Sequence, residues 1–135
     1  MDLNAHRERT NQENRFMVHN GMRLVVLEAD RAVVELEVGP ESLNLLGAVH
    51  GGVYFTMADC AAGAAARSGG SAYVTCDADI HFIRGAKSGL LRATAQVRHR
   101  GRTTCRVSVE ITDGDGRLLC DASCTMFRVD TPAPQ

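Results

Sequence analysis

The sequence predicts an α+β domain in which one antiparallel sheet curls around a single long helix. Its 135 residues suit one domain with one hydrophobic core. Several segments alternate apolar and polar residues with a period of two, which is typical of half-buried antiparallel strands. Residues 53–68, in contrast, are small and apolar on nearly every side, and a helix of that kind belongs inside a protein.

The expected elements follow one another along the chain. Residues 1–20 form a polar N-terminal segment with a short helix over 6–18 that ends near "HNG". The helix over 53–68 ends at "SGG", which supplies a C-cap glycine. The domain is expected over 21–129 and a flexible tail over 130–135. Six strands are expected at 22–30, 34–38, 73–82, 91–97, 104–111 and 118–126.

Composition and spacing argue against several classes of function. The net charge of −1 and the absence of Trp give little support for nucleic-acid binding. No apolar run approaches the roughly 20 residues of a membrane span, and the polar N-terminus lacks the apolar core of a signal peptide, so we expect a cytoplasmic protein. The odd number of cysteines, five, without a CxxC pair, fits free thiols that mostly serve as small core residues.

Two hydrolase classes lack their sequence signatures. The chain has no GxSxG nucleophile elbow, which argues against a serine hydrolase of the α/β class. Its five histidines show no HxxxH-like spacing, so no metal site is expected, and no other cofactor is suggested.

The feature that needs explaining is Asp59, a lone carboxylate in the predicted buried helix. Burying a carboxylate without a partner costs several kcal/mol or forces it to become neutral. No Lys or Arg lies three or four residues away to pair with it. Either the helix turns Asp59 toward water or toward an arginine of a neighbouring strand, or the acid sits in a semi-apolar pocket where its pKa is tuned for chemistry.

The start of the same helix carries the motif "HGG", His50 to Gly52. The first N–H groups of a helix have no intrahelical acceptor, and glycine lets a ligand approach them closely. Such donors suit an oxygen that gains negative charge during a reaction, although a plain turn before a helix looks the same in sequence. Gly51 lies about 12 Å from Asp59 along the helix, so the two groups meet more readily across a homodimer with antiparallel central helices.

The residues that carry these features resemble a known family. "NLLGAVHGGVYFTMADCAAGAAA", residues 44–66, resembles the signature of PaaI-type hotdog-fold acyl-CoA thioesterases, with Asn six residues before HGG and Asp eight residues after its first glycine. The segments "ADIHFIRGAKSG" and "LRATAQVRHRGRTTCRVSVEI" are similar to later strands of that family. The resemblance covers residues 16–127 and implies the hotdog fold, a six-stranded antiparallel sheet wrapped around one long central helix.

The resemblance implies hydrolysis of an acyl-CoA thioester and a role for each matching residue. Asp59 matches the catalytic carboxylate, acting as nucleophile or as general base for water. Gly51 matches the backbone donor to the thioester carbonyl, and Asn44 the residue that orients the carbonyl or the water. His50 matches the motif histidine, mainly a support for the loop. Thr75 falls near a family Ser/Thr that assists the water, but strict alternation along its strand would turn it away from the helix.

The resemblance also implies basic residues that receive the phosphates of coenzyme A, because charged bidentate contacts suit phosphate. The alternative for each is an ordinary solvated strand face. Gly85 stands where the family usually has Pro, and the usual acid around 88–90 is absent, which changes a loop near the expected nucleotide entrance. The candidates are Arg84, Lys87, Arg98, Arg100 and Arg102.

Two other functions fit the same fold. One is a hotdog dehydratase or hydratase acting on acyl thioesters, whose sites generally pair a carboxylate with a His at a different spacing. The other is a non-catalytic acyl-CoA-binding protein. The resemblance leaves the acyl group open among aryl, phenylacetyl and fatty acyl chains, and it allows a homodimer with shared sites or a dimer of dimers.

Overall fold

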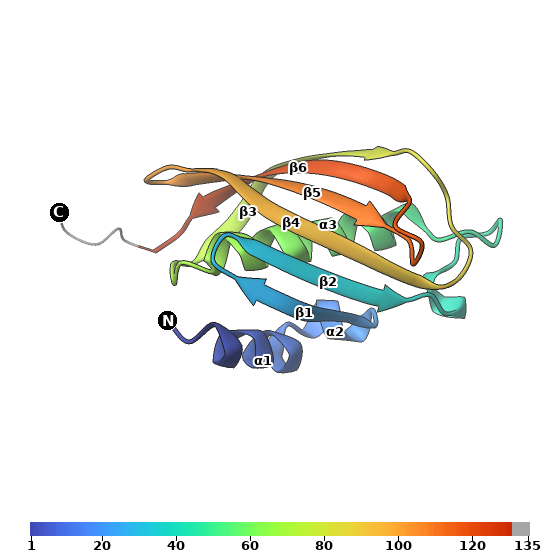
Figure 1. Cartoon of the computed structure of the whole chain (residues 1–135), viewed down its shortest axis with the longest axis horizontal. Coiled ribbons are helices and arrows are strands. Elements are labelled where there is room, and N and C mark those ends of the chain that lie inside the picture. Colours follow the sequence, from blue (N-terminus) through green and yellow to red (C-terminus); the bar gives the residue numbers. More distant parts are fainter. Residues whose placement is uncertain (131–135) are drawn as a thin grey trace.

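Six antiparallel strands form one sheet that wraps the long helix α3, so the hotdog fold is confirmed (Figure 1). The computed structural model describes residues 1–130. The helices are α1 (Leu3–Glu13), α2 (Arg15–His19) and α3 (Gly51–Arg67), with a 3-10 turn at Pro40–Ser42. The strands are β1 (Met22–Glu28), β2 (Arg31–Glu37), β3 (Tyr73–Phe82), β4 (Leu90–Arg100), β5 (Thr104–Thr112) and β6 (Leu118–Arg128).

The order of the strands in the sheet is β1-β2-β4-β5-β6-β3. Strands β1 and β2 form a tight hairpin whose turn residue Asp30 has a positive φ of 64°, a conformation that Asp tolerates better than most residues. Helix α3 connects β2 to β3, which pairs only with β6. Both β1 and β3 are therefore edge strands of the sheet in this chain.

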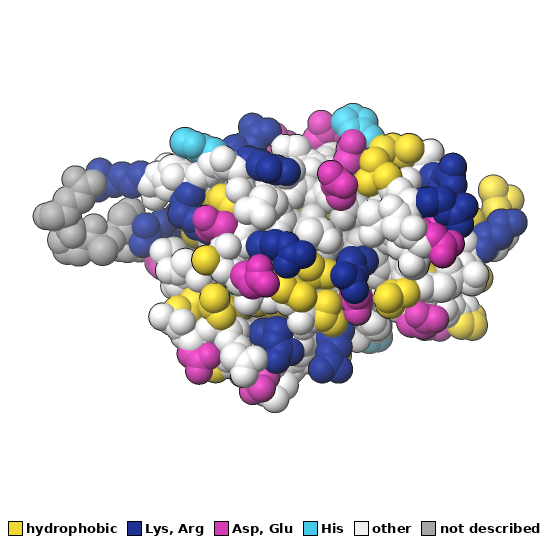
Figure 2. Space-filling model, viewed as in Figure 1, with side chains coloured by type: hydrophobic (Ala, Val, Ile, Leu, Met, Phe, Trp, Pro, Cys, Tyr) yellow, Lys and Arg dark blue, Asp and Glu magenta, His cyan; other side chains and the backbone are white. Residues whose placement is uncertain are grey.

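The sheet closes tightly on α3 because the buried face of this helix consists largely of alanine. The face contributes Ala61, Ala62, Ala64, Ala65 and Ala66, none more than 1% exposed. Strands β4 and β5 supply the facing layer with alternating buried side chains, as the period of two predicted, whereas β2 buries Ala32, Val33 and Val34 in succession. The outer face of the sheet carries basic and acidic side chains mixed together (Figure 2).

The N-terminal segment contains two helices where the sequence predicted one over 6–18. The break falls at Asn14. Its backbone N–H donates to the Thr10 carbonyl at the end of α1, and its side-chain oxygen accepts from the Met17 N–H of α2. Asn11 fixes α1 to β1, since its side chain both accepts from and donates to the backbone of Leu24 at 2.8 Å. Among residues 1–130, no helix combines the length and hydropathy needed to cross a membrane.

The C-terminal tail predicted over 130–135 lies outside the described residues from position 131 onward. Asp130 itself belongs to the ordered sheet corner, because its carboxylate accepts from the Ala72 N–H and from the Arg128 guanidinium. We therefore propose that the domain extends to residue 130.

Strand β3 departs from regular alternation. Its pairing with β6 shifts between Thr75 and Asp77, which leaves Cys76 as a bulge. Before the bulge, Tyr73 is buried, and beyond it Ala78 and Ile80 are the partly buried residues. Cys76 is exposed, whereas Cys105, Cys120 and Cys124 are buried. The bulge thus reverses which residues of β3 face the helix.

The C-terminal end of α3 depends on the buried Ser68. Its hydroxyl donates to the Ala65 carbonyl at 2.7 Å and accepts from the Asp30 N–H at 2.9 Å. The replacement Ser68→Ala should lower the free energy of unfolding by about 1–3 kcal/mol, because it leaves the Asp30 N–H without its partner. Urea denaturation of this variant and of Ser71→Ala measures the difference. Equal effects of the two changes would contradict the assignment.

Candidate active site

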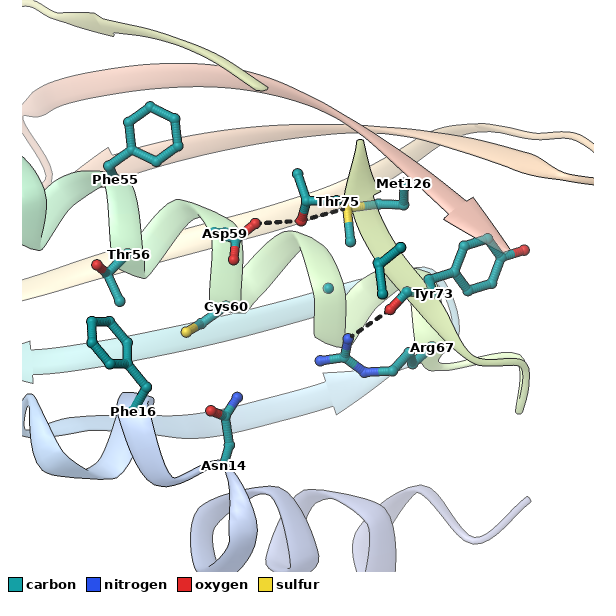
Figure 3. A pocket seen from close by; sticks show the side chains of 12 residues that line it. Asn14, Phe16, Phe55, Thr56, Asp59, Cys60, Arg67, Tyr73, Thr75 and Met126 are labelled. Carbon is teal, nitrogen blue, oxygen red and sulfur yellow. Dashed lines mark hydrogen bonds between the residues drawn. The ribbon is translucent and has the colours of Figure 1, made fainter. Parts of the chain in front are cut away.

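A pocket of about 590 Å³ opens between α3, α2 and the first residues of β3 (Figure 3). Polar groups of α3 and β3 lie on one wall, and apolar side chains form the sides. It is lined by Asn14, Phe16, Phe55, Thr56, Asp59, Cys60, Gly63, Arg67, Tyr73, Val74, Thr75 and Met126.

Asp59 faces this pocket, and Thr75 holds its carboxylate. The Thr75 hydroxyl donates to one carboxylate oxygen of Asp59, while in Figure 3 the second oxygen points away from Thr75. Asp59 is half-buried, so it keeps a path to water. The expectation that Thr75 points away from the helix is wrong. The bulge at Cys76 shifts the register by one residue and turns Thr75 inward.

The N-terminus of α3 leaves one backbone donor free. The helix begins at Gly51, two residues earlier than predicted, because His50 acts as its N-cap. The His50 Nδ1 accepts from the Gly52 N–H at 2.8 Å. Within residues 1–130, no acceptor lies at hydrogen-bonding distance from the Gly51 N–H. This N–H is therefore the donor at the helix start that a ligand oxygen can use.

Asn44 organises the loop that leads into α3. Its side-chain oxygen accepts from the N–H groups of Leu46 and Ala48, and its backbone N–H donates to the Ala48 carbonyl at 2.7 Å. The loop is joined to the β3–β4 connection by a hydrogen bond from Val49 to Ala86. The carbonyl end of the Asn44 amide is thus occupied, which leaves its NH₂ group for any contact with substrate.

The structure does not bring Gly51 and Asp59 together within one chain. They lie on the same helix with two turns between them, about 12 Å apart along its axis. Gly51 lies beside the Phe82 ring, at the end of β3 away from Thr75. One chain therefore contains a carboxylate at one position and a free donor at another.

The basic residues suggested for coenzyme A lie at opposite ends of α3. Arg84 and Lys87 belong to the exposed β3–β4 connection near the helix N-terminus. Arg102 is exposed in the β4–β5 hairpin beyond the other end. Arg98 lies on the outer face of the sheet, where its Nε donates to Ser108 at 2.7 Å. The helix of 17 residues separates the two groups by about 25 Å.

Arg100 has a structural role that the sequence did not reveal. Its guanidinium donates to Asp30 at 2.8 Å and to the carbonyl groups of Ala65 and Ala66, the last turn of α3. It also lies over the Tyr73 ring, 5.7 Å from the centroid. With these donors engaged, we propose that Arg100 has a structural role in place of the phosphate contact that the resemblance implied.

Two further residues of the pocket escaped the sequence analysis. Burial raises the pKa of the Cys60 thiol to about 12, so Cys60 stays protonated and is not a nucleophile. Burial lowers the pKa of Arg67, whose guanidinium enters the pocket from the last turn of α3. The spacing of Asp59, Gly63 and Arg67, each four residues apart, was the available signal that they share one helix face.

Residues 46–120 match the model of the Thioesterase superfamily, and the chain belongs to this family of thioester hydrolases. The acyl-coenzyme A thioesterase PaaI of Escherichia coli is 37% identical over 94 residues, covering 69% of this chain and 67% of the relative. Its structure has a TM-score of 0.88 and 30% identity, covering 96% of this chain and 93% of that one. A 1,4-dihydroxy-2-naphthoyl-CoA hydrolase of Listeria monocytogenes is 34% identical over 109 residues, covering 78% and 89%.

A protein of Streptococcus pneumoniae described as a hypothetical thioesterase was solved with coenzyme A. It has a TM-score of 0.78 and 33% identity, covering 83% of this chain and 91% of that one. Two further structures of the protein carry single alanine replacements, one of an aspartate and one of a threonine sixteen positions later. Asp59 and Thr75 have the same separation of 16 residues.

The role of Arg100 predicts a loss of stability when it is replaced. Arg100→Gln should lower the free energy of unfolding by about 1–3 kcal/mol, because it removes charged hydrogen bonds to Asp30 and to the end of α3. Arg102→Gln, an exposed neighbour in the same hairpin, should change it by less than about 0.5 kcal/mol. Chemical denaturation of both variants compares them, and an unchanged Arg100→Gln variant would refute the structural role.

Proposed function

We propose that the protein hydrolyses an acyl-CoA thioester to the free acid and coenzyme A. The family is one of thioester hydrolases, and the names of two relatives specify coenzyme A thioesters as substrates. The neighbour solved with coenzyme A supports the same leaving group. The observation that carries the proposal is the Asp59 carboxylate, held by Thr75 at a pocket wall beside apolar side chains.

Asp59 supplies the attacking group in this proposal. As general base, its carboxylate takes a proton from a water molecule while the water oxygen attacks the thioester carbon. As nucleophile, it attacks that carbon directly and forms an anhydride that water then opens. In both routes the carbon–sulfur bond breaks and the thiolate of coenzyme A leaves and takes up a proton. Thr75 fixes one carboxylate oxygen, which leaves the other for the reaction.

The Gly51 N–H is the proposed donor to the thioester carbonyl oxygen. When the carbon becomes tetrahedral, this oxygen gains negative charge, which an oriented N–H at a helix N-terminus stabilises. His50 supports this role by taking the neighbouring Gly52 N–H, which fixes the first turn of the helix. Asn44 supports it from the preceding loop, where its amide NH₂ is available to a carbonyl or a water molecule.

A homodimer is proposed because each chain holds only half of this arrangement. Strand β3 is an edge strand, and an unpaired edge invites a second strand. Exposed apolar side chains on β3 and next to it include Val74, Phe82 and Ile83, each more than 50% exposed, and Leu45 and Leu46 are exposed in the loop before α3. Pairing of two β3 edges in antiparallel fashion would set Gly51 of one protomer near Asp59 of its partner. A dimer of dimers is compatible with this unit.

We propose that the phosphates of coenzyme A bind the exposed cations near the two ends of α3, namely Arg84, Lys87 and Arg102. In an antiparallel dimer, the N-terminal end of one α3 lies toward the C-terminal end of the other, so cations that one chain separates can approach across the interface. Arg98 is less suited, since it lies on the outer face of the sheet and bonds to Ser108.

Replacing the carboxylate tests the chemistry. Asp59→Asn keeps the shape and the contact with Thr75 but removes the base or nucleophile, so kcat should fall at least about 100-fold. Thiol release from a panel of aryl- and fatty-acyl-CoA thioesters measures it. Asp77→Asn, which removes an exposed carboxylate on the other side of the bulge, is the matched control. Turnover by Asp59→Asn at the level of the unchanged protein would refute the catalytic role proposed for Asp59.

Mixing two inactive variants tests the shared site. Gly51→Pro removes the N–H, and the position accepts Pro because it is the first residue of the helix and His50 before it is extended, with φ −65° and ψ 139°. Gly51→Ala keeps the N–H and is the control. Its Cβ would lie 3.5 Å from the Phe82 ring, an ordinary van der Waals contact, so the position has room for it. Unfolding and reassembling equal amounts of Gly51→Pro and Asp59→Asn should restore about a quarter of the activity, because half the dimers then contain one intact site of two.

Two results would contradict the shared site. The first is a mixture that stays inactive although exchange of subunits is demonstrated by differently tagged chains. The second is an active protein that runs as a monomer in size-exclusion chromatography with light scattering.

A further inference from the structure

The pocket contains a cation that the proposed chemistry does not use. Arg67 lies two turns beyond Asp59 on the same face of α3, with Gly63 between them. Figure 3 shows its guanidinium extending back along the helix on the pocket side. The arrangement therefore places a carboxylate and a guanidinium at two positions along one wall of the same cavity.

Gly63 makes room for this guanidinium. A Cβ at position 63 would lie 2.9 Å from Nη1 of Arg67 and 3.0 Å from Nη2, closer than side chains normally approach. The guanidinium thus rests on the bare helix backbone one turn from Asp59, a rise of about 6 Å. This distance is close to the length of one aromatic ring.

Within residues 1–130, the guanidinium of Arg67 lacks an anionic partner. No carboxylate lies within 4 Å of it, and its one hydrogen bond is a long one, 3.4 Å, to the Tyr73 carbonyl. On the side of α1, Glu13 is paired with Arg9 at 2.7 Å. Burial and the charge of Arg67 lower the pKa of His6, which favours the neutral imidazole, so this neighbour is not an anionic partner of Arg67. A half-buried cation with most of its donors unused can complete its hydrogen bonds on a ligand that enters the pocket.

The other walls fit a flat apolar group between the two charges. Phe16 and Phe55 approach from α2 and α3, and Val74 and Met126 from the sheet. Phe16 is 65% exposed and Phe55 40% exposed, so their rings are available to a ligand. At the Arg67 end, Asn14 adds an amide, whose oxygen caps α2 and whose NH₂ group remains a donor.

We propose that Arg67 is a specificity-determining residue that binds a carboxylate at the far end of the acyl group. The preferred substrate is then a short, flat acyl thioester, about one aromatic ring long, with a carboxylate opposite the thioester. The inference rests on the proposed thioesterase function. The substrate carboxylate would lie at hydrogen-bond distance from the Arg67 guanidinium and about one helical turn from Asp59. Its attraction to Arg67 therefore outweighs its repulsion by Asp59.

Three coenzyme A thioesters of matched size test this proposal, namely 4-carboxybenzoyl-CoA, 4-hydroxybenzoyl-CoA and benzoyl-CoA. The unchanged protein should show a kcat/KM at least about tenfold higher for the carboxylate than for benzoyl-CoA. Arg67→Met should abolish this preference, measured as the ratio of kcat/KM for 4-carboxybenzoyl-CoA to that for benzoyl-CoA. Arg67→Lys, which keeps the charge, should retain part of it.

Controls separate a local contact from general effects. Arg23→Met removes an exposed cation of β1, so it changes the net charge equally, and the preference should survive. Gly63→Ala, which displaces the guanidinium, should reduce the preference as Arg67→Met does. If the unchanged protein favours the hydroxyl compound or hydrolyses all three equally, the proposal is overturned while the thioesterase function stands.

A binding measurement covers the case in which none of the three is hydrolysed. The thermal midpoint of unfolding is then followed with terephthalate and with benzoate, for the unchanged protein and for Arg67→Met. Stabilisation by terephthalate alone, lost in Arg67→Met, supports the role of Arg67 even where the thioesterase proposal fails. Equal responses of the two proteins overturn it.

Discussion

The central constraint on this structure is a carboxylate on a helix that a sheet encloses. Complete burial of Asp59 would cost several kcal/mol, and the alanine face of α3 offers it no partner. The fold meets this constraint at the edge of the sheet, where β3 supplies a hydroxyl and the pocket supplies access to water. The bulge at Cys76, the exposed edge strand and the position of the pocket all belong to this one arrangement.

The same helix holds, at separate positions along its axis, the three groups proposed for chemistry and for substrate binding. Its first turn presents a free N–H at Gly51, its middle carries Asp59, and its last turns carry Gly63 and Arg67. Because a helix is stiff, these positions along its axis stay fixed, and one copy cannot fold back to bring its two ends to one atom. The separation is the reason for the proposal that a second copy of the chain completes the site.

The fold was predictable because any sequence that forms this core must place its apolar and polar residues in the same pattern. The period of two in the strands and the apolar helix predict the wrapped sheet, and the position of Asp59 identifies the pocket wall. The orientation of Thr75 was not predictable, since a bulge leaves no mark in an alternating sequence. The use of Arg100 was equally hidden, because its partners Asp30 and Ala66 are distant in sequence. Arg67 was not predicted as a pocket residue because it lies beyond the three- or four-residue spacing of neighbouring side chains on a helix. At that spacing from Asp59 the sequence has Gly63.

The alanine face of α3 also determines how the site can adapt to a ligand. Alanine has no rotamers to exchange and its face of α3 is fully packed against the strands, so the helix is held rigidly behind the pocket wall that its other face forms. Adjustment to acyl groups of different width must therefore come from the opposite side, where α2 with Phe16 and the start of β3 with Val74 are exposed. Rigidity and compliance are thus divided between the two sides of one cavity, and the groups of the helix that we propose for the reaction lie on the rigid side.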